Sequence, residues 1–170
     1  MGYQEHQQKV QSEGPRVIRC GIVTISDTRT FENDTSGDAI RAALSGGGHE
    51  IVRYEIVPDE PDQIAALVKE LTGRCQVILT NGGTGITRRD STFEVIDALL
   101  EKRLPGFGEL FRMLSYDDIG PAAMLSRATA GVYRDTLIFC MPGSTGAVRL
   151  ALDKLIINEL PHLVWEILRQ

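Results

Sequence analysis

The sequence predicts an α/β fold built on a mostly parallel sheet, and two observations support this prediction. Apolar runs typical of buried strands alternate three times with segments of helical periodicity over residues 17–100. Such alternation predicts right-handed βαβ units and a parallel sheet. The first run, residues 17–26, is apolar at nearly every position, as expected for a parallel strand covered on both faces.

The elements after this first strand follow in order. Residues 27–33 are expected to form a loop, after which Thr35 or Ser36 caps a helix that carries an apolar stripe. Three glycines at residues 46–48 end this helix. Residues 50–57 are then predicted to form the second strand.

The middle of the chain repeats this pattern. Pro61 occupies a favoured first helical position, and the helix that it starts leads to a third strand at residues 76–80. Residues 93–100 are predicted to form the next helix. The Pro-Gly pair at residues 105–106 interrupts the pattern, and residues 107–114 form a further helix.

The last third of the chain adds two short strands, residues 129–133 and 136–141, which are joined by a turn at residues 134–135. A helix over residues 145–158 follows. The chain ends in an amphipathic turn or two after Pro161.

The length of 170 residues predicts a single domain. Residues 1–15 are polar and rich in glutamine, so we expect a disordered arm and no signal peptide, with the domain over residues 16–170. No apolar run approaches the ~18 residues of a membrane span, so no membrane partner is expected. The net charge of −5 argues against nonspecific nucleic-acid binding but leaves room for a small anion in a local positive pocket.

The cysteines and histidines limit the kinds of site and the cellular location that the sequence predicts. The three cysteines, Cys20, Cys75 and Cys140, lie in or beside apolar runs and form no C-x-x-C pair. Buried, reduced thiols and a cytoplasmic location are therefore expected. No cluster of His, Cys and Asp has zinc spacing, and no Ser-His-Asp set is indicated.

Four loops are expected at the carboxyl ends of the strands, where ligands bind in parallel sheets. They comprise residues 26–28, 58–60, 82–90 and 142–146, and each is rich in glycine, hydroxyl groups or acids. The sequence therefore predicts one cleft lined by all four. The hydroxyls of the last loop either cap the following helix or meet a phosphate.

The loop at residues 82–90 contains three glycines, followed by two arginines and an aspartate. Glycine lets backbone N–H groups approach an anion, and the following helix start adds free N–H groups and partial positive charge. The loop is not a Walker A motif, because Ile86 stands where that motif has lysine. It is either a phosphate cradle or a tight turn, in which residues 91–94 fit a capping box.

Three acids in these loops have both a structural and a functional interpretation. Asp27 is a turn residue or a cleft residue, and Asp90 is a helix cap or a ligand. Pro61 makes Glu60 the helix cap, which leaves Asp59 free to face the cleft. Carboxylates with backbone donors suit Mg²⁺ and phosphoryl-type transfer, which needs mainly positioning and charge neutralisation.

Six short motifs occur in a fixed order along the chain. They are residues 24–27 (Thr-Ile-Ser-Asp), 34–37 (Asp-Thr-Ser-Gly), 82–85 (Gly-Gly-Thr-Gly) with Arg89 and Asp90, 105–107 (Pro-Gly-Phe), 126–127 (Ser-Arg) and 142–144 (Pro-Gly-Ser). This ordered set resembles the MoaB/MogA family of molybdopterin-binding proteins in molybdenum cofactor biosynthesis. The resemblance covers roughly residues 17–165.

The resemblance implies a three-layer αβα fold with a Rossmann-like sheet, a homo-trimer or homo-hexamer, and molybdopterin as ligand. In active members ATP adenylylates molybdopterin with Mg²⁺, and the product passes to a metal-insertion partner. By the same resemblance Asp59 and Asp90 are the catalytic and metal-binding residues. The ligand-binding positions are Ser26, Asp27, Gly82, Gly83, Thr84, Gly85, Ser126, Pro142, Gly143 and Ser144.

Residues 144–148 and the ending around residues 160–163 resemble the MoaB branch more than the adenylyltransferase branch. Two functions therefore stay open: an enzyme that adenylylates molybdopterin, or a protein that binds and delivers molybdopterin or its precursor. A nicotinamide-dependent oxidoreductase is disfavoured because the dinucleotide fingerprint is absent. A C-terminal apolar set covers the core or meets a neighbouring subunit: Leu160, Leu163, Val164, Trp165 and Leu168.

Overall fold

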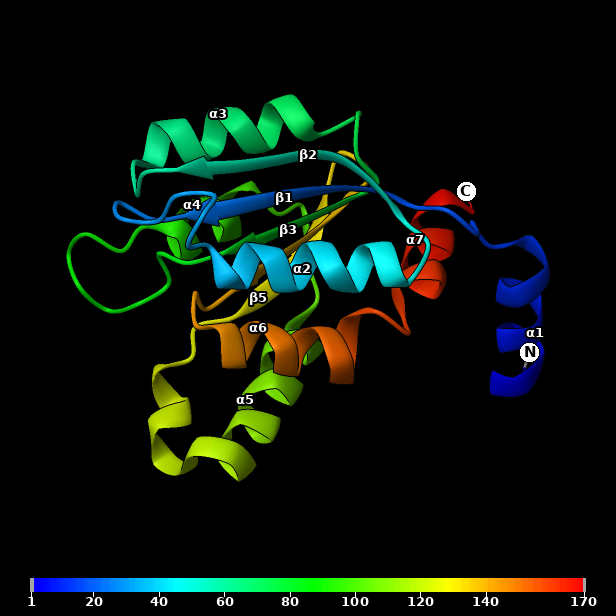
Figure 1. Cartoon of the computed structure of the whole chain (residues 1–170). Coiled ribbons are helices and arrows are strands. Elements are labelled where there is room, and N and C mark those ends of the chain that lie inside the picture. Colours follow the sequence, from blue (N-terminus) through cyan, green and yellow to red (C-terminus); the bar gives the residue numbers. More distant parts are fainter. Residues whose placement is uncertain (1, 170) are drawn as a thin grey trace.

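The computed structural model describes residues 2–169, with only the backbone at Tyr3, and contains a six-stranded sheet in the order β2-β1-β3-β6-β5-β4 (Figure 1). β2, β1, β3 and β6 run parallel, and β5 is antiparallel to both neighbours. The mostly parallel α/β sheet predicted from the sequence is confirmed. The strands are β1 (Arg19–Ile25), β2 (Glu50–Val57), β3 (Val77–Asn81), β4 (Lys102–Arg103), β5 (Thr129–Tyr133) and β6 (Thr136–Met141).

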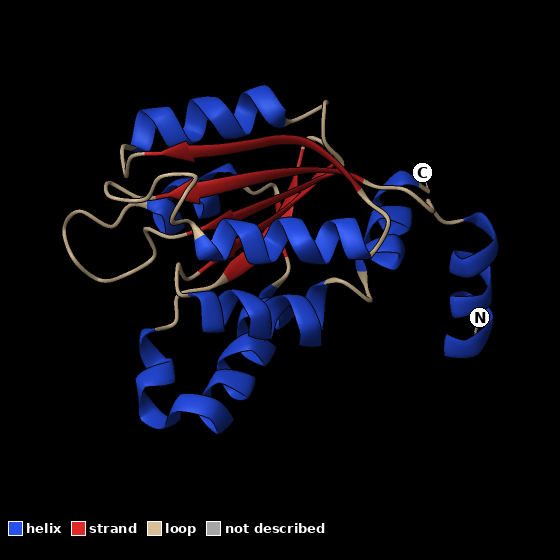
Figure 2. Ribbon diagram, in the orientation of Figure 1, coloured by secondary structure: helices blue, strands red, loops and turns tan. Residues whose placement is uncertain are grey.

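Helices cover both faces of the sheet, which confirms the three-layer αβα arrangement (Figures 1 and 2). One face carries α3 (Pro61–Leu71) and α4 (Thr92–Leu99). The other carries α2 (Thr35–Gly46), α5 (Pro105–Ile119), α6 (Thr145–Ala151) and α7 (Leu160–Leu168). Each face has its own buried core, with Ile64 and Ile96 on the first side and Phe111 and Phe139 on the second.

The order of the strands changes direction at β1. The chain passes from β1 to β2 at one edge of the sheet and then returns across β1 to β3. Loops that leave neighbouring strands at such a switch point diverge and form a crevice. The buried Asn81 side chain at the end of β3 donates to Thr24 Oγ1 at the end of β1, at 2.9 Å, and closes the floor of this crevice.

Two helices begin at residues other than those predicted. Asp34 caps α2, because its Oδ1 accepts a hydrogen bond from Gly37 N at 2.9 Å, so the prediction of Thr35 or Ser36 as the cap is wrong. α5 begins at Pro105, where proline fits the first helical position and does not interrupt the pattern.

The ends of the later helices also differ in detail from the prediction. α5 continues to Ile119 and is followed by a 3₁₀-helix over Gly120–Leu125. The helix predicted over residues 145–158 is α6 followed by a π-helical turn, Leu152–Ile156. Both extensions lie on the same face of the sheet as α2 (Figure 1).

The N-terminal segment forms helix α1 (Tyr3–Glu13), where the sequence analysis expected a disordered arm. Gln, Glu and Lys are good helix formers, and Gly2 N donates to Glu5 Oε2 at 3.0 Å. α1 lies against α7 and apart from the sheet (Figure 1). Its anchor is the His6 ring, whose centroid is 5.2 Å from that of Trp165.

The three cysteines are buried and form no disulfide, as predicted. Burial raises the pKa of Cys20 and of Cys140 to about 12, so both thiols stay protonated at neutral pH. Within residues 2–169, no helix has the length and apolar composition to cross a bilayer.

The C-terminal apolar residues pack inside the chain. Leu160, Val164 and Trp165 are buried, and the first two belong to the core on the α2 face. Leu168 is 53 % exposed and is outside this packing. Of the two interpretations of this segment, packing against the core and contact with a neighbouring subunit, core packing explains its buried residues.

Candidate functional site

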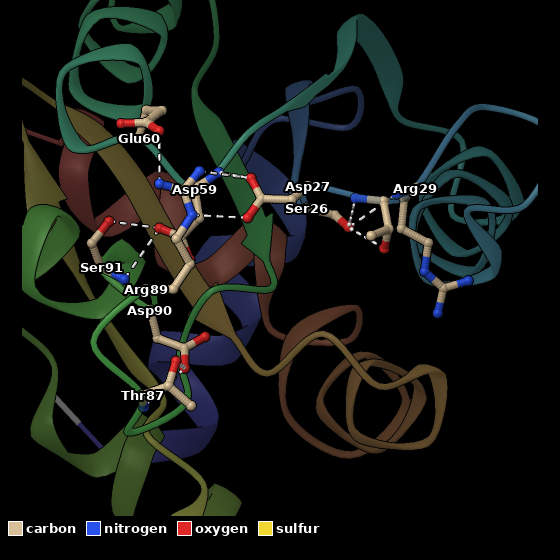
Figure 3. A network of polar contacts seen from close by, with 10 residues as sticks. Ser26, Asp27, Arg29, Asp59, Glu60, Thr87, Arg89, Asp90 and Ser91 are labelled. Atoms are coloured by element: carbon tan, nitrogen blue, oxygen red, sulfur yellow. Dashed lines mark hydrogen bonds and ion pairs between the residues drawn. The ribbon is translucent and has the colours of Figure 1, made fainter.

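The loops after β1, β2, β3 and β6 meet at one edge of the sheet, as predicted, and Figure 3 shows residues of the first three. Asp59 N donates to Asp27 Oδ1 at 3.1 Å, which joins the loops after β2 and β1. Gly82 N donates to Met141 O at 3.1 Å, which joins β6 to the loop after β3. Arg89 joins the loop after β3 to the loops after β1 and β2.

Arg89 holds three of the four loops together. Its Nε and Nη2 donate to Asp27 Oδ2 and Oδ1 at 2.8 and 2.9 Å, and its Nη1 donates to Glu60 Oε1 at 2.7 Å. The paired hydrogen bonds from Arg89, with a smaller contribution from Asp59 N, lower the pKa of Asp27 to about 2. The hydrogen bonds to Asp27 and Glu60 raise the pKa of Arg89. Asp27, predicted to bind ligand, thus has its charge neutralised by an arginine.

Asp59 is a nearly buried carboxylate, 5 % exposed, that caps α4 from a neighbouring loop. Its Oδ1 accepts hydrogen bonds from Ser91 N at 3.1 Å and Ser91 Oγ at 2.6 Å (Figure 3). Because the Ser91 hydroxyl is used in this way, the capping box predicted at residues 91–94 does not form. Glu60 is the N-cap residue of α3, as expected, so Asp59 lies outside that helix.

Asp90 closes the glycine loop on itself. Its Oδ2 accepts hydrogen bonds from Thr87 N at 3.0 Å and Thr87 Oγ1 at 2.6 Å. Figure 3 shows this pair below Asp59 and Ser91 in the view. Asp90 therefore does not cap α4, and the interpretation of it as a helix cap is wrong.

Glycine is required where the loops after β1, β3 and β6 approach one another. Gly82 and Gly83 have φ values of +94° and +64°, a region that side chains disfavour. A Cβ at Gly82 would overlap the carbonyl oxygen of Ile25, and one at Gly143 would lie 3.0 Å from the Gly82 Cα. The loops pack backbone against backbone at this point.

The glycine loop presents a run of unpaired donors. Within the described chain, the backbone N–H groups of Gly83, Thr84, Gly85 and Ile86 donate no hydrogen bond, whereas Thr87 N is used by Asp90. Successive free N–H groups next to glycines in the left-handed region form a concavity that binds anions. This part of the loop therefore has the chemistry of a phosphate cradle.

Arg127 supports this cradle from behind, and the sequence analysis missed its role. Its Nε donates to Thr84 O at 2.9 Å and its Nη2 to Gly85 O at 2.6 Å, while Glu94 pairs with the guanidinium. The Ser-Arg motif at residues 126–127 predicts a ligand-binding role for Ser126 and none for Arg127. Ser126 ends the 3₁₀-helix, and its hydroxyl forms no hydrogen bond with the rest of the described chain.

The starts of α2 and α6 converge on the fourth loop. Ser36 Oγ donates to Gly143 O at 2.8 Å, and the hydroxyl oxygens of Thr35 and Thr145 lie 2.7 Å apart. Ser144 Oγ accepts from Ala147 N at 3.3 Å, so this predicted ligand residue serves as the cap of α6. Two helix N-termini, both favourable to anions, thus border the cleft.

A small cavity of about 90 Å³ lies in the crevice between the loops after β1, β3 and β6. It brings the predicted Ser26, Gly82 and Gly143 together with residues that were not predicted. The full lining is Thr24, Ile25, Ser26, Arg29, Asp34, Asn81, Gly82 and Gly143.

Four arginines surround the cleft, and they differ in whether an acidic side chain neutralises their charge. Arg89 and Arg127 are neutralised by acids. Arg29 donates only to a backbone carbonyl, Asn33 O at 2.6 Å, and the exposed Arg88 forms no ion pair with any described residue. Arg29 and Arg88 therefore carry the positive charge available to an anionic ligand.

The carboxylate oxygens that remain free suit a hard cation. Asp59 Oδ2 and Asp90 Oδ1 accept no hydrogen bond from residues 2–169, and the buried Thr92 Oγ1 is also unpartnered. A Cβ on Gly83 would overlap both Asp59 Oδ2 and Thr92 Oγ1, so these two oxygens lie close together against the Gly83 backbone. These oxygens fit Mg²⁺, which is usually bound through one or two carboxylates, waters and substrate phosphates.

Fold and site together define an α/β protein with a cleft at the switch point of its sheet, whose free backbone donors have the chemistry to hold an anion. Residues 21–162 match the family described as "Probable molybdopterin binding domain". The chain is 53 % identical over 170 residues to molybdenum cofactor biosynthesis protein B of Bacillus subtilis, with 98 % of each chain covered.

Solved structures agree with this match. A crystal structure of molybdenum cofactor biosynthesis protein B is 52 % identical, with a TM-score of 0.88 over 93 % of this chain and 100 % of that one. The tungsten cofactor synthesizing protein MoaB of Pyrococcus furiosus is 39 % identical, with a TM-score of 0.81 over 90 % and 98 % of the two chains. The chain therefore belongs to the MoaB/MogA molybdopterin-binding family, as its motifs indicated.

Proposed function

We propose that the chain binds molybdopterin in this cleft and transfers an adenylyl group to it from ATP. The observation that carries the proposal is the run of free N–H groups from Gly83 to Ile86, with the unneutralised Arg88 in the same loop and the unneutralised Arg29 lining the cavity beside Gly82. Both substrates are phosphate esters. A cleft with a backbone cradle, two helix starts and two available cations matches that shared chemistry.

The reaction needs little covalent participation by the protein. An oxygen of the terminal phosphate of molybdopterin attacks the α-phosphorus of ATP. The bond from that phosphorus to the oxygen bridging to the β-phosphate breaks, and pyrophosphate leaves with its electron pair. The chain contributes position and charge neutralisation, through backbone N–H groups and arginines. The adenylylated product is then available to a metal-insertion partner.

Asp59 and Asp90 would hold the Mg²⁺ that accompanies ATP, through the carboxylate oxygens left free. The ion would neutralise charge on the phosphate oxygens. In each residue the other oxygen is already fixed by Ser91 or Thr87, so the free oxygen is held in a defined direction.

The test compares Asp59→Asn and Asp90→Asn with the wild type in formation of adenylylated molybdopterin. Asparagine keeps one oxygen for the Ser91 or Thr87 donors but removes the charge. We expect product formation to fall by at least about 100-fold in each variant, with unchanged circular dichroism. Asp62→Asn, an exposed acid in the first turn of α3, is the matched control. Full activity in both cleft variants would contradict the assignment.

A second function, binding and delivery without chemistry, is favoured by a different observation. Asp59 and Asp90 each use one oxygen to stabilise local structure, so both have a role that needs no reaction. The discriminating experiment incubates the chain with ATP, Mg²⁺ and molybdopterin and measures pyrophosphate. Release over many turnovers supports the enzyme, whereas stoichiometric molybdopterin binding without pyrophosphate supports the carrier.

We also propose that the chain forms a homo-trimer or homo-hexamer. Apolar side chains are exposed together on α5 and the following 3₁₀-helix, and such patches mark interfaces between proteins. They are Leu110, Met113, Tyr116, Ile119, Met124 and Leu125. Light scattering should give three or six chains for the wild type and a smaller species for Met113→Glu. A monomeric wild type would contradict this proposal.

A further inference from the structure

A second cluster of reactive side chains lies between α1 and α7, at the opposite end of the strands from the cleft (Figure 1). It consists of His6 from α1 and of His162 and Glu166 from α7. His6 Nε2 lies 2.9 Å from His162 Nε2 and 2.7 Å from Glu166 Oε1, and His162 Nε2 lies 3.7 Å from the same oxygen. Three potential ligand atoms thus surround one point.

Hydrogen bonds alone do not satisfy this cluster. His162 Nδ1 lies 3.0 Å from Glu159 Oε2, so we assign its proton to Nδ1, which leaves Nε2 with a lone pair. His6 Nε2 then has one proton, and its contact with His162 Nε2 uses it. Glu166 Oε1 is a buried atom 2.7 Å from His6 Nε2, whose single proton is already used in the contact with His162, and it accepts no hydrogen bond of good geometry from the described residues. A buried carboxylate oxygen beside two imidazole nitrogens that share one proton favours a cation.

The geometry suits a zinc ion. A tetrahedral ion with Zn–N bonds of about 2.0–2.1 Å holds its ligand atoms about 3.3 Å apart. The separations of 2.9, 2.7 and 3.7 Å lie on both sides of that value. Two imidazoles and one carboxylate also form the protein ligand set of open zinc sites, in which water takes the fourth position.

Neighbouring side chains already orient the three ligands. Glu159 holds the Nδ1 side of His162, in the carboxylate–histidine pairing typical of metal sites. Arg169 Nε donates to Glu166 Oε2 at 2.8 Å, which turns Oε1 toward the histidines. The Trp165 ring packs edge-on against His6 and shields one side of the cluster.

A cavity of about 480 Å³ between α1, α7 and the loop before β2 borders the cluster at His162. His162 lines this cavity, as does His49, the remaining histidine of the chain, which is not part of the cluster. The cavity leaves room for a metal-bound water. The sequence analysis could not find these ligands, because 156 positions separate the two histidines.

We propose that His6, His162 and Glu166 bind one zinc ion, which fastens helix α1 to α7. The inference does not depend on the function of the cleft. In this arrangement zinc replaces the proton between the two imidazoles and pairs with Glu166 Oε1. None of the described side chains of α1 belongs to either core, so the metal supplies a cross-link that this packing does not.

The test uses the untagged full-length chain freed of metal by chelation, with Zn²⁺ added in a calorimeter. We expect one Zn²⁺ per chain. His6→Ala and His162→Ala should each weaken binding by at least about 100-fold, and Glu159→Gln by about 10-fold. His49→Ala is the matched control and should bind as the wild type does. Because α1 lies outside both cores, His6→Ala tests the site without endangering the fold.

A second readout reports the place of binding. Trp165 is the single tryptophan of the chain and touches His6. Cu²⁺, which also binds imidazoles, should quench its fluorescence in the wild type and in His49→Ala but not in His6→Ala. The proposal is overturned if the wild type binds no Zn²⁺, since a shared proton then bridges the rings, or if His6→Ala and His162→Ala bind Zn²⁺ as tightly as the wild type.

Discussion

Ser91 gives both its backbone N–H and its hydroxyl to a single oxygen, Oδ1, of Asp59. This oxygen caps α4 from a loop 32 positions earlier in the chain. The acid expected to do chemistry therefore also joins two loops of the cleft. A substitution at Asp59 changes stability as well as ligand binding, and the two effects must be measured apart.

Replacement of Asp59 by alanine should destabilise the chain by about 2–3 kcal/mol, because two donors of Ser91 lose their acceptor in a partly buried place. Asp59→Asn keeps an acceptor oxygen and should cost about 1 kcal/mol. Urea unfolding followed by circular dichroism measures both. Asp62→Ala should change stability by no more than about 0.5 kcal/mol; an equal loss in Asp59→Ala and Asp62→Ala would count against the cap.

Asp27 should contribute to stability in a defined pH window. Its pKa is lowered in the folded state to about 2, chiefly by Arg89. A lowered folded pKa means that the stabilisation is complete above the unfolded pKa of about 3.9 and is lost as pH falls through the folded value. The difference in melting temperature between wild type and Asp27→Asn should be constant above pH ~5 and shrink below pH ~4. A difference that grows on acidification would contradict the pairing.

Gly83→Ala should damage the cleft. Its φ of +64° disfavours a side chain, and the added Cβ would meet Asp59 and Thr92. We expect a loss of about 1–3 kcal/mol in stability and a clear loss of ligand affinity. Gly46→Ala, at the end of α2 with open space around it, should be neutral or stabilising by up to about 1 kcal/mol. Equal stability of the two variants would show that the turn tolerates a side chain.

Arg127→Met should loosen the glycine loop, because the carbonyls of Thr84 and Gly85 lose their donors. Limited digestion with trypsin measures this, since cleavage after Arg88 requires the loop to open. We expect faster cleavage there than in the wild type. Arg74→Met, which removes an exposed pair with Glu70 on the far side of α3, should leave the rate unchanged. An unchanged rate of cleavage in Arg127→Met would show that this arginine does not stabilise the loop.

Local sequence signals were sufficient for the strands and for most helix positions. The second strand was predicted at the residues observed, because an apolar run between Gly46–Gly48 and Pro61 leaves few alternatives. The end of α5 was not predicted: its exposed apolar residues, such as Met113 and Tyr116, weaken the periodicity that marks a helix. Helix α1 likewise lacks an apolar stripe, and its support comes from α7 at the other end of the chain.

For the cleft, the loops could be predicted from the sequence, but the contacts between them could not. Glycines, acids and hydroxyls marked the loops, since these residue types are required by turns and anions alike. The partners of those residues could not be derived, because Arg89 reaches Asp27 across 62 positions and Arg127 reaches Gly85 across 42. Only the folded chain distinguishes neutralised arginines, which hold the loops, from those left for a ligand.

The neutralisation of Arg89 and Arg127 has a kinetic consequence. A phosphate ligand approaching from a distance meets a chain of net charge −5 with two uncompensated arginines at the cleft. Long-range electrostatic steering is therefore weak. Added salt slows the encounter of strongly attracting partners, but it should not slow the encounter here. For the ligand proposed above, affinity would come from short-range contacts that delay departure, so we expect the glycine loop to control the residence time of the ligand and not its rate of arrival.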